Sequence, residues 1–242
     1  ARLEAVRSRI GEAALRAGRR VSDVRLVAVT KTFPVSAALA AWEAGQRDFG
    51  ENRPEEGAQK IAAFDRQLPP DVASSEQPTW HMIGHVQSRK ADVVVEHFDV
   101  VHSVDRLKIA RRLSRFATQL GRQIPVLLEC NVSGEAAKYG YAAHNWERDT
   151  AVRTALLSEV DFVIGLPGLR VVGLMTMAPL VDDVEDVRWV FASLRSLAQA
   201  LAERFPSASW HDLSMGMTDD FEVAVEEGAT LVRIGRAIFG ER

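Results

Sequence analysis

Short runs of Val, Leu and Ile alternate along the whole chain with longer segments whose apolar residues recur every three or four positions. The short runs are typical of strands buried on both faces, and the longer segments are typical of helices that cover a sheet. This alternation is the pattern of βαβ units around a parallel sheet. The expected strands lie near Leu26–Thr30, Arg47–Gly50, Trp80–Gly84, Val100–Ser103, Val126–Val132, Arg170–Met175, His211–Met215 and Leu231–Ile234.

Eight strands with helices between them predict an α/β protein built as a single (β/α)8 barrel of the TIM type, in one domain over residues 1–242. An extra N-terminal helix over about the first 18 residues, ending at Gly18, is expected to precede the barrel. An open, doubly wound sheet is the alternative. The segment Gln67–Pro78 is expected to form a surface loop, because its prolines fit neither a helix interior nor a central strand.

Composition narrows the function classes. Hydrophobic residues make up 47% of the 242-residue chain and charged residues 26%, as in ordinary globular proteins. The net charge of −3 gives no general attraction for nucleic acid or an anionic membrane, so neither is an expected partner. No apolar stretch approaches the roughly 20 residues that span a bilayer. Any site for an anion must therefore be local.

A single cysteine, Cys130, excludes an intrachain disulfide and a thiolate metal cluster, and it favours a reducing cytoplasm as the compartment. Its apolar surroundings in Val126–Cys130 indicate a buried structural thiol. The six histidines show no paired ligand spacing, so we expect no metal site.

Residues with unusual chemistry follow the expected strands. Active sites of such barrels lie at the carboxyl ends of the strands. Lys31 comes directly after the first strand, Asn52 after the second, and Gly235 and Arg236 after the eighth. A lysine here can supply both a positive charge and a nucleophile.

The loops after the last two strands predict a phosphate site. Ser214, Gly216 and Thr218 offer hydroxyl and backbone N–H groups before a helix expected to start at Asp219 or Asp220, and Gly235 offers a backbone N–H group after strand eight. The alternative is that Gly216 serves only a turn and that Thr218 or Asp219 caps the helix, with Glu222 completing a capping box.

A lysine facing a phosphate site suggests a phosphorylated aldehyde held as a Schiff base, and pyridoxal 5'-phosphate (PLP) fits. Arg233, beside the phosphate site, can donate hydrogen bonds but accept none, so it would keep the ring nitrogen unprotonated. Alternatively, Arg233 binds the phosphate directly or pairs with an acidic residue in the barrel.

Other polar residues near the strand ends have simpler explanations. We interpret His81 as a hydrogen-bonded structural histidine, and Lys90 as a residue that caps or solvates a helix. The loop Asn131–Gly140 either binds a ligand or is stabilised by its own side chains. We assign no catalytic residue.

At these residues the chain resembles the pyridoxal phosphate homeostasis family, whose barrel is related to the N-terminal domain of alanine racemase. The resemblance implies that Lys31 carries PLP covalently, Asn52 lies near the ring and Arg233 faces the ring nitrogen. It also implies that Ser214, Gly216, Thr218, Gly235 and Arg236 surround the phosphate. The matching segments are Leu26–Lys31, Phe49–Asn52, His81–Lys90, Asn131–Glu135, Lys138–Gly140, Gly173–Met177, Leu213–Phe221 and Val232–Gly235.

The chain also departs from the family pattern. Val86 and Arg89 stand where the family has Leu and Asn, and Thr30 and Thr218 where it has serine. After Asn52, Arg53-Pro54 stands where the family has a different pair of residues. The threonines keep a hydroxyl group, whereas the arginines alter the rim of the expected site.

Two functions remain open. A carrier would hold PLP on Lys31, act in intracellular PLP homeostasis and pass the cofactor to PLP-dependent apoenzymes. A PLP-dependent racemase or lyase would need a second acid–base group opposite Lys31. In alanine racemases the partner subunit's additional domain supplies a tyrosine, and this sequence places its two tyrosines, Tyr139 and Tyr141, after strand five. We therefore expect a non-catalytic carrier, monomeric and cytoplasmic. Binding of another sugar or nucleotide phosphate is a third possibility.

Overall fold

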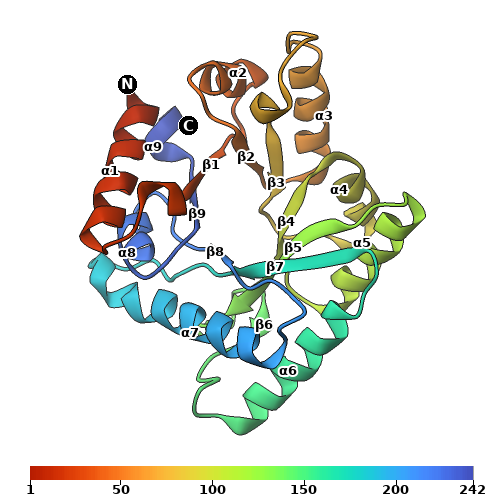
Figure 1. The fold of residues 1–242 in the computed structure, drawn as a ribbon, viewed down its shortest axis with the longest axis vertical. Helices are drawn as coiled ribbons and strands as arrows, with labels where there is room; N and C mark the ends of the chain where they lie inside the picture. The colour runs from red at the N-terminus through yellow and green to blue at the C-terminus, as the bar shows by residue number, and fades with distance from the viewer. Residues whose placement is uncertain (242) are drawn as a thin grey trace.

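Eight parallel strands close into a barrel in the computed structural model, which describes residues 1–241 (Figure 1). Neighbouring strands follow the order β4-β3-β2-β1-β9-β8-β7-β5, and pairing of β4 with β5 completes the ring. The predicted barrel is confirmed and the open sheet is excluded. The strands are β1 Arg25–Val29, β2 Asp48–Glu51, β3 Thr79–Met82, β4 Val100–Val104, β5 Ile124–Asn131, β7 Leu169–Met175, β8 Asp212–Ser214 and β9 Leu231–Ile234.

Helices surround the barrel on its outside (Figure 1). None of those within residues 1–241 is long and apolar enough to cross a membrane. They are α1 Arg2–Arg16, α2 Val35–Glu43, α3 Pro54–Asp65, α4 Ala91–His97, α5 Leu107–Gln119, α6 Thr150–Ile164, α7 Arg188–Arg204, α8 Phe221–Glu226 and α9 Arg236–Phe239. Short 3-10 turns lie at Val21–Asp23, Ser74–Glu76, Ser88–Lys90 and Val184–Val187.

The extra helix α1 is present, and it ends at Arg16, two residues before the predicted end. Gly18 adopts φ +67°, which closes the helix, and Arg19 N–H donates to Ala14 O at 2.8 Å across that turn. The helix packs against α8 and α9, and an ion pair joins its Arg9 to Glu222.

The apolar residues form two layers, as strands buried on both faces require. The larger layer packs the strands against the helices, and a smaller cluster fills part of the barrel interior. Cys130 belongs to the larger layer, and burial raises the pKa of its thiol. The interior cluster is Val27, Leu127, Val172, Met175 and Leu231.

Strand ends differ from the prediction by two residues at most, and β9 has the predicted ends. The third strand ends at Met82 and not Gly84, because the chain turns there toward the carboxyl-end loops. A two-residue strand, β6 Tyr141–Ala142, pairs with β5 and was not predicted, since two residues carry no periodic signal. Residues 67–78 form a largely exposed loop with one short turn, as expected.

Candidate functional site

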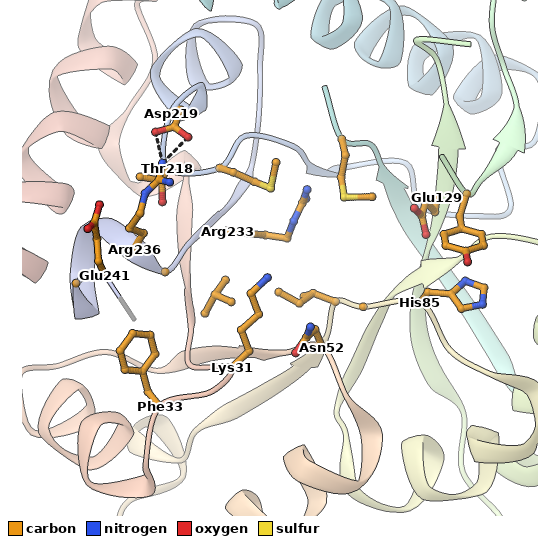
Figure 2. A pocket seen from close by; sticks show the side chains of 18 residues that line it. Lys31, Phe33, Asn52, His85, Glu129, Thr218, Asp219, Arg233, Arg236 and Glu241 are labelled. Atoms are coloured by element: carbon orange, nitrogen blue, oxygen red, sulfur yellow. Dashed lines mark hydrogen bonds and ion pairs between the residues drawn. The ribbon is translucent and has the colours of Figure 1, made fainter. Parts of the chain in front are cut away.

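A cavity of about 690 Å³ lies at the carboxyl ends of the strands. Six of the eight residues expected to bind a cofactor line it: Lys31, Asn52, Thr218, Arg233, Gly235 and Arg236. Figure 2 shows Lys31 and Arg233 near the middle of the cavity, with Arg236 and Thr218 toward one end and His85 and Glu129 toward the other. The barrel therefore brings together residues up to about 200 positions apart in sequence.

Buried polar contacts hold the backbone next to Lys31. The Thr30 hydroxyl donates to Glu51 Oε1 at 2.6 Å, and Lys60 Nζ donates to Thr30 O at 2.6 Å. Lys60 also forms an ion pair with Glu51, whose side chain is 1% exposed. Thr32 adopts φ +68°, a conformation that is rare for a β-branched residue. These contacts fix the turn that aims Lys31 into the cavity.

Replacing Thr30 with valine tests this turn, because it removes only the hydroxyl group. We expect the free energy of unfolding to fall by about 1 kcal/mol, since one acceptor bond of the buried Glu51 is lost. Urea denaturation measures this change. Thr30→Ser keeps the hydroxyl and serves as the control. Equal stability of the valine variant and the serine variant would contradict the importance of the bond.

The loop after β8 is shaped by Gly216. This residue adopts φ +93°, and a Cβ atom there would lie 2.6 Å from Ala224 Cβ and 2.9 Å from Phe221 Cα. Gly216 O accepts from Arg233 N–H at 3.0 Å. Gly216 therefore sets the path of the loop and does not itself line the cavity, which agrees with the turn interpretation.

The helix after this loop starts at Phe221, one or two residues later than the expected start at Asp220 or Asp219. Asp220 precedes it, and its Oδ1 accepts from Met217 N–H at 2.6 Å. The alternative capping box is not formed, because the N-cap is Asp220 and makes no side-chain cap bond; Glu222 instead pairs with Arg9. Thr218 is left at the cavity wall, and Arg236 forms an ion pair with Asp219 at 2.6 Å.

Arg233 is buried inside the barrel, with 5% of its surface exposed. Its Nη1 donates to Ser214 Oγ at 2.6 Å and its Nη2 to Thr176 O at 3.0 Å. Burial lowers the pKa of the guanidinium to about 10, although Asp220 and Glu129 act in the opposite direction. Both partners are neutral, and within residues 1–241 no carboxylate forms an ion pair with Arg233. Two of the five N–H groups are thus occupied, and others are available to a ligand.

Ser214 lies behind Arg233 and does not line the cavity. It is fully buried, and its hydroxyl contacts His102 as well as Arg233. His81 lies between His102 and Asp48 and forms hydrogen bonds with both. This agrees with its interpretation as a hydrogen-bonded structural histidine. His102 was not predicted as a site residue; the visible signal was a histidine inside the apolar strand Val100–Val104.

His85 and Glu129 lie at the end of the cavity away from Arg236 (Figure 2), and Tyr139, which stacks on His85, also lines the cavity. The rings of His85 and Tyr139 stack with centroids 3.9 Å apart, and His85 Nδ1 lies 2.8 Å from Asp105 Oδ2. Burial, with a further effect from Asp105, raises the pKa of Glu129 from its ordinary value to about 7. Glu129 was not predicted, although a carboxylate within Val126–Cys130 was a visible signal.

The loop after β5 is stabilised by its own side chains. Asn131 Nδ2 donates to Glu135 O at 2.9 Å, and Gly134 N–H donates to Asn131 Oδ1 at 2.9 Å. Lys138 pairs with Glu135 and donates to Met177 O at 3.1 Å.

Across residues 1–241, no group of three or more His, Cys, Asp or Glu side chains could hold a metal ion.

The parallel barrel, with a lysine after its first strand and a cavity bounded by its last two loops, is that of the alanine racemase N-terminal domain. The family model of this domain, "Alanine racemase, N-terminal domain", matches residues 2–242. The chain is 41% identical over 240 residues to the pyridoxal phosphate homeostasis protein of Vibrio cholerae, covering 99% of this chain and 94% of that protein. It therefore belongs to the pyridoxal phosphate homeostasis protein family.

Solved structures agree with this assignment. PipY of Synechococcus elongatus, in a structure with PLP bound, is 36% identical and superposes with a TM-score of 0.78 over 97% of this chain and 100% of that chain. An alanine racemase of Clostridium difficile is 14% identical, with a TM-score of 0.68 over 96% of this chain and 58% of that one. The second likeness shows the fold alone.

Proposed function

We propose that this protein binds PLP, holds it covalently as a Schiff base on Lys31, and acts in intracellular PLP homeostasis. The observation that carries the proposal is the placement of Lys31 in one cavity with Arg233, Thr218, Gly235 and Arg236. The names of its relatives and the PLP-bound structure of PipY support it. When bound, PLP supplies an aldehyde that a lysine amine can hold and a phosphate that fixes its orientation.

The donor set fits this cofactor. A hydroxyl, a guanidinium group and a glycine backbone, from Thr218, Arg236 and Gly235, suit a phosphate group. Asn52 lies beside Lys31 and would contact the ring. Arg233 offers only donors, so it would bind an unprotonated ring nitrogen. Ser214 and Gly216 would act from behind, through Arg233 and the loop path.

We assign a carrier function in preference to catalysis, in a single domain and a monomer within the cytoplasm, with PLP-dependent apoenzymes as recipients. If Arg233 faces the ring nitrogen, that nitrogen would stay unprotonated and the cofactor would be a weak electron sink, which would favour holding over turnover. Racemase activity is the alternative, and Glu129 and Tyr139 at the far end of the cavity are the acid–base candidates for it.

An exchange assay separates the two functions. The purified protein is loaded with PLP, and exchange of the α-hydrogen is followed for a panel of amino acids in heavy water. A carrier should show no exchange near ordinary enzyme rates, on the order of 1 per second or faster. Exchange at such rates would establish the racemase alternative.

Replacing Arg236 with methionine tests the phosphate site. We expect about tenfold weaker binding of PLP, because a charge-assisted hydrogen bond at a half-exposed position is lost. Pyridoxal, which lacks the phosphate, should bind both proteins equally. Fluorescence titration measures both affinities, and an equal loss for pyridoxal would place the phosphate elsewhere.

A further inference from the structure

A chain of hydrogen bonds runs from Arg233 through the barrel interior to the opposite end of the strands. Ser214 Oγ lies 2.8 Å from His102 Nδ1, and His102 Nε2 lies 2.8 Å from His81 Nδ1. His81 Nε2 lies 2.9 Å from Asp48 Oδ1. The side chains come from β8, β4, β3 and β2, and the three between Arg233 and Asp48 are fully buried.

With a neutral His81 ring, the carboxylate of Asp48 fixes the direction of every bond in this chain. A carboxylate only accepts, so His81 must carry its proton on Nε2 and donate it to Asp48. Nδ1 of a neutral His81 ring is then an acceptor, which requires His102 to donate from Nε2. His102 Nδ1 is left as an acceptor for the Ser214 hydroxyl.

The direction matters because of what it does at Ser214. When the hydroxyl hydrogen points to His102, the oxygen lone pairs are available to Arg233 Nη1. In the reverse direction His102 and Arg233 would both donate to the same oxygen. The hydroxyl hydrogen would then need another acceptor in a fully buried place, which is costly.

Burial favours the neutral state of His102 that this direction requires. Loss of solvent lowers the pKa of His102 well below its usual range, and His81, Arg233 and Arg25 act in the same direction. A neutral ring carries one donor and one acceptor, as the chain needs.

We infer that Asp48, His81 and His102 are positioning residues that orient Ser214 as an acceptor and so hold the Arg233 guanidinium against the cavity. This inference goes beyond the proposed function in assigning residues at the opposite barrel end to the site. It rests on that function only where it concerns PLP. Arg233 keeps two neutral acceptors, Ser214 Oγ and Thr176 O, and the chain fixes the first of them.

The structure supplies a matched pair of variants. Asp48 and Asp212 both contact Arg25, at 3.5 and 3.3 Å, and their side chains are 18% and 20% exposed. Only Asp48 also contacts His81. Asp48→Ala therefore breaks the chain, whereas Asp212→Ala removes an equivalent surface carboxylate and leaves the chain intact.

The first measurement uses the protein without cofactor. Nitrogen-15 NMR of labelled histidines should find the ring proton on Nε2 in both His81 and His102 of the wild type. The control variant Asp212→Ala should give the same result. In Asp48→Ala a population protonated on Nδ1 should appear. A proton on Nδ1 of either ring in the wild type, or unchanged tautomers in Asp48→Ala, would overturn the inference.

The second measurement uses PLP labelled with nitrogen-15 in its ring. Asp48→Ala should shift the ring-nitrogen resonance and weaken binding about three- to tenfold, the effect of about one hydrogen bond, and Asp212→Ala should do neither. Equal effects of the two variants would mean that this chain of hydrogen bonds has only a structural role. Failure of the wild type to bind PLP would refute the proposed function and leave the tautomer result standing.

Discussion

Replacing Lys31 with alanine is expected to abolish the visible absorbance band of the PLP-loaded protein. Borohydride reduction should then leave no cofactor attached, because Lys31 supplies the amine that the proposed covalent bond requires. The contacts expected from Thr218, Arg233 and Arg236 remain. We therefore expect PLP to bind the variant weakly and reversibly, and mass spectrometry after reduction measures the difference.

Lys108→Ala is a suitable control, since Lys108 lies exposed on α5, outside the cavity. It should trap cofactor as the wild type does. Retention of the band in Lys31→Ala would move the covalent bond to another lysine. A wild-type protein that shows no band and binds no PLP would refute both the carrier hypothesis and the racemase hypothesis.

Replacing Glu129 with glutamine should change how stability depends on pH. Burial raises the pKa of Glu129 in the folded protein from 4.5 to about 7. Between these values the unfolded chain releases the proton while the folded protein keeps it, so the wild type loses stability as pH rises through this window. At 1.36 kcal/mol per pKa unit the loss is about 3 kcal/mol, complete above pH 7.

Glutamine carries no such proton, so Glu129→Gln should gain about 3 kcal/mol relative to the wild type between pH 4.5 and pH 8. Urea denaturation of the cofactor-free proteins at the two pH values measures this gain. Glu43→Gln, at an exposed position of α2, should show no comparable change. The same stability difference at both pH values would mean that Glu129 titrates normally.

The barrel could be predicted because each strand is buried on both faces, which leaves a continuous apolar run in the sequence. The clustering of Lys31, Arg233 and Arg236 followed from one geometric rule, that parallel strands bring their carboxyl ends to one mouth. Helix and strand ends were less accurate, as at Met82 and Arg16, because single turns and caps decide them.

The contacts inside the barrel could not be predicted. His102 and Ser214 are 112 residues apart, and nothing local in either strand indicates that their side chains meet. Ser214 was expected at the phosphate for its hydroxyl, yet that hydroxyl is turned into the barrel toward Arg233. Which polar side chains meet inside a barrel depends on strand register and tilt, which a single sequence does not specify.

The ion pair between Arg236 and Asp219 has a consequence for unloading. A phosphate that binds Arg236 competes with a carboxylate already seated on the same guanidinium. If the proposed phosphate departs, Asp219 can pair with Arg236 again, so the emptied site would not retain a bare positive charge that holds back the leaving anion. Arrival and departure would then be an exchange of one anion for another, which would suit the proposed carrier function.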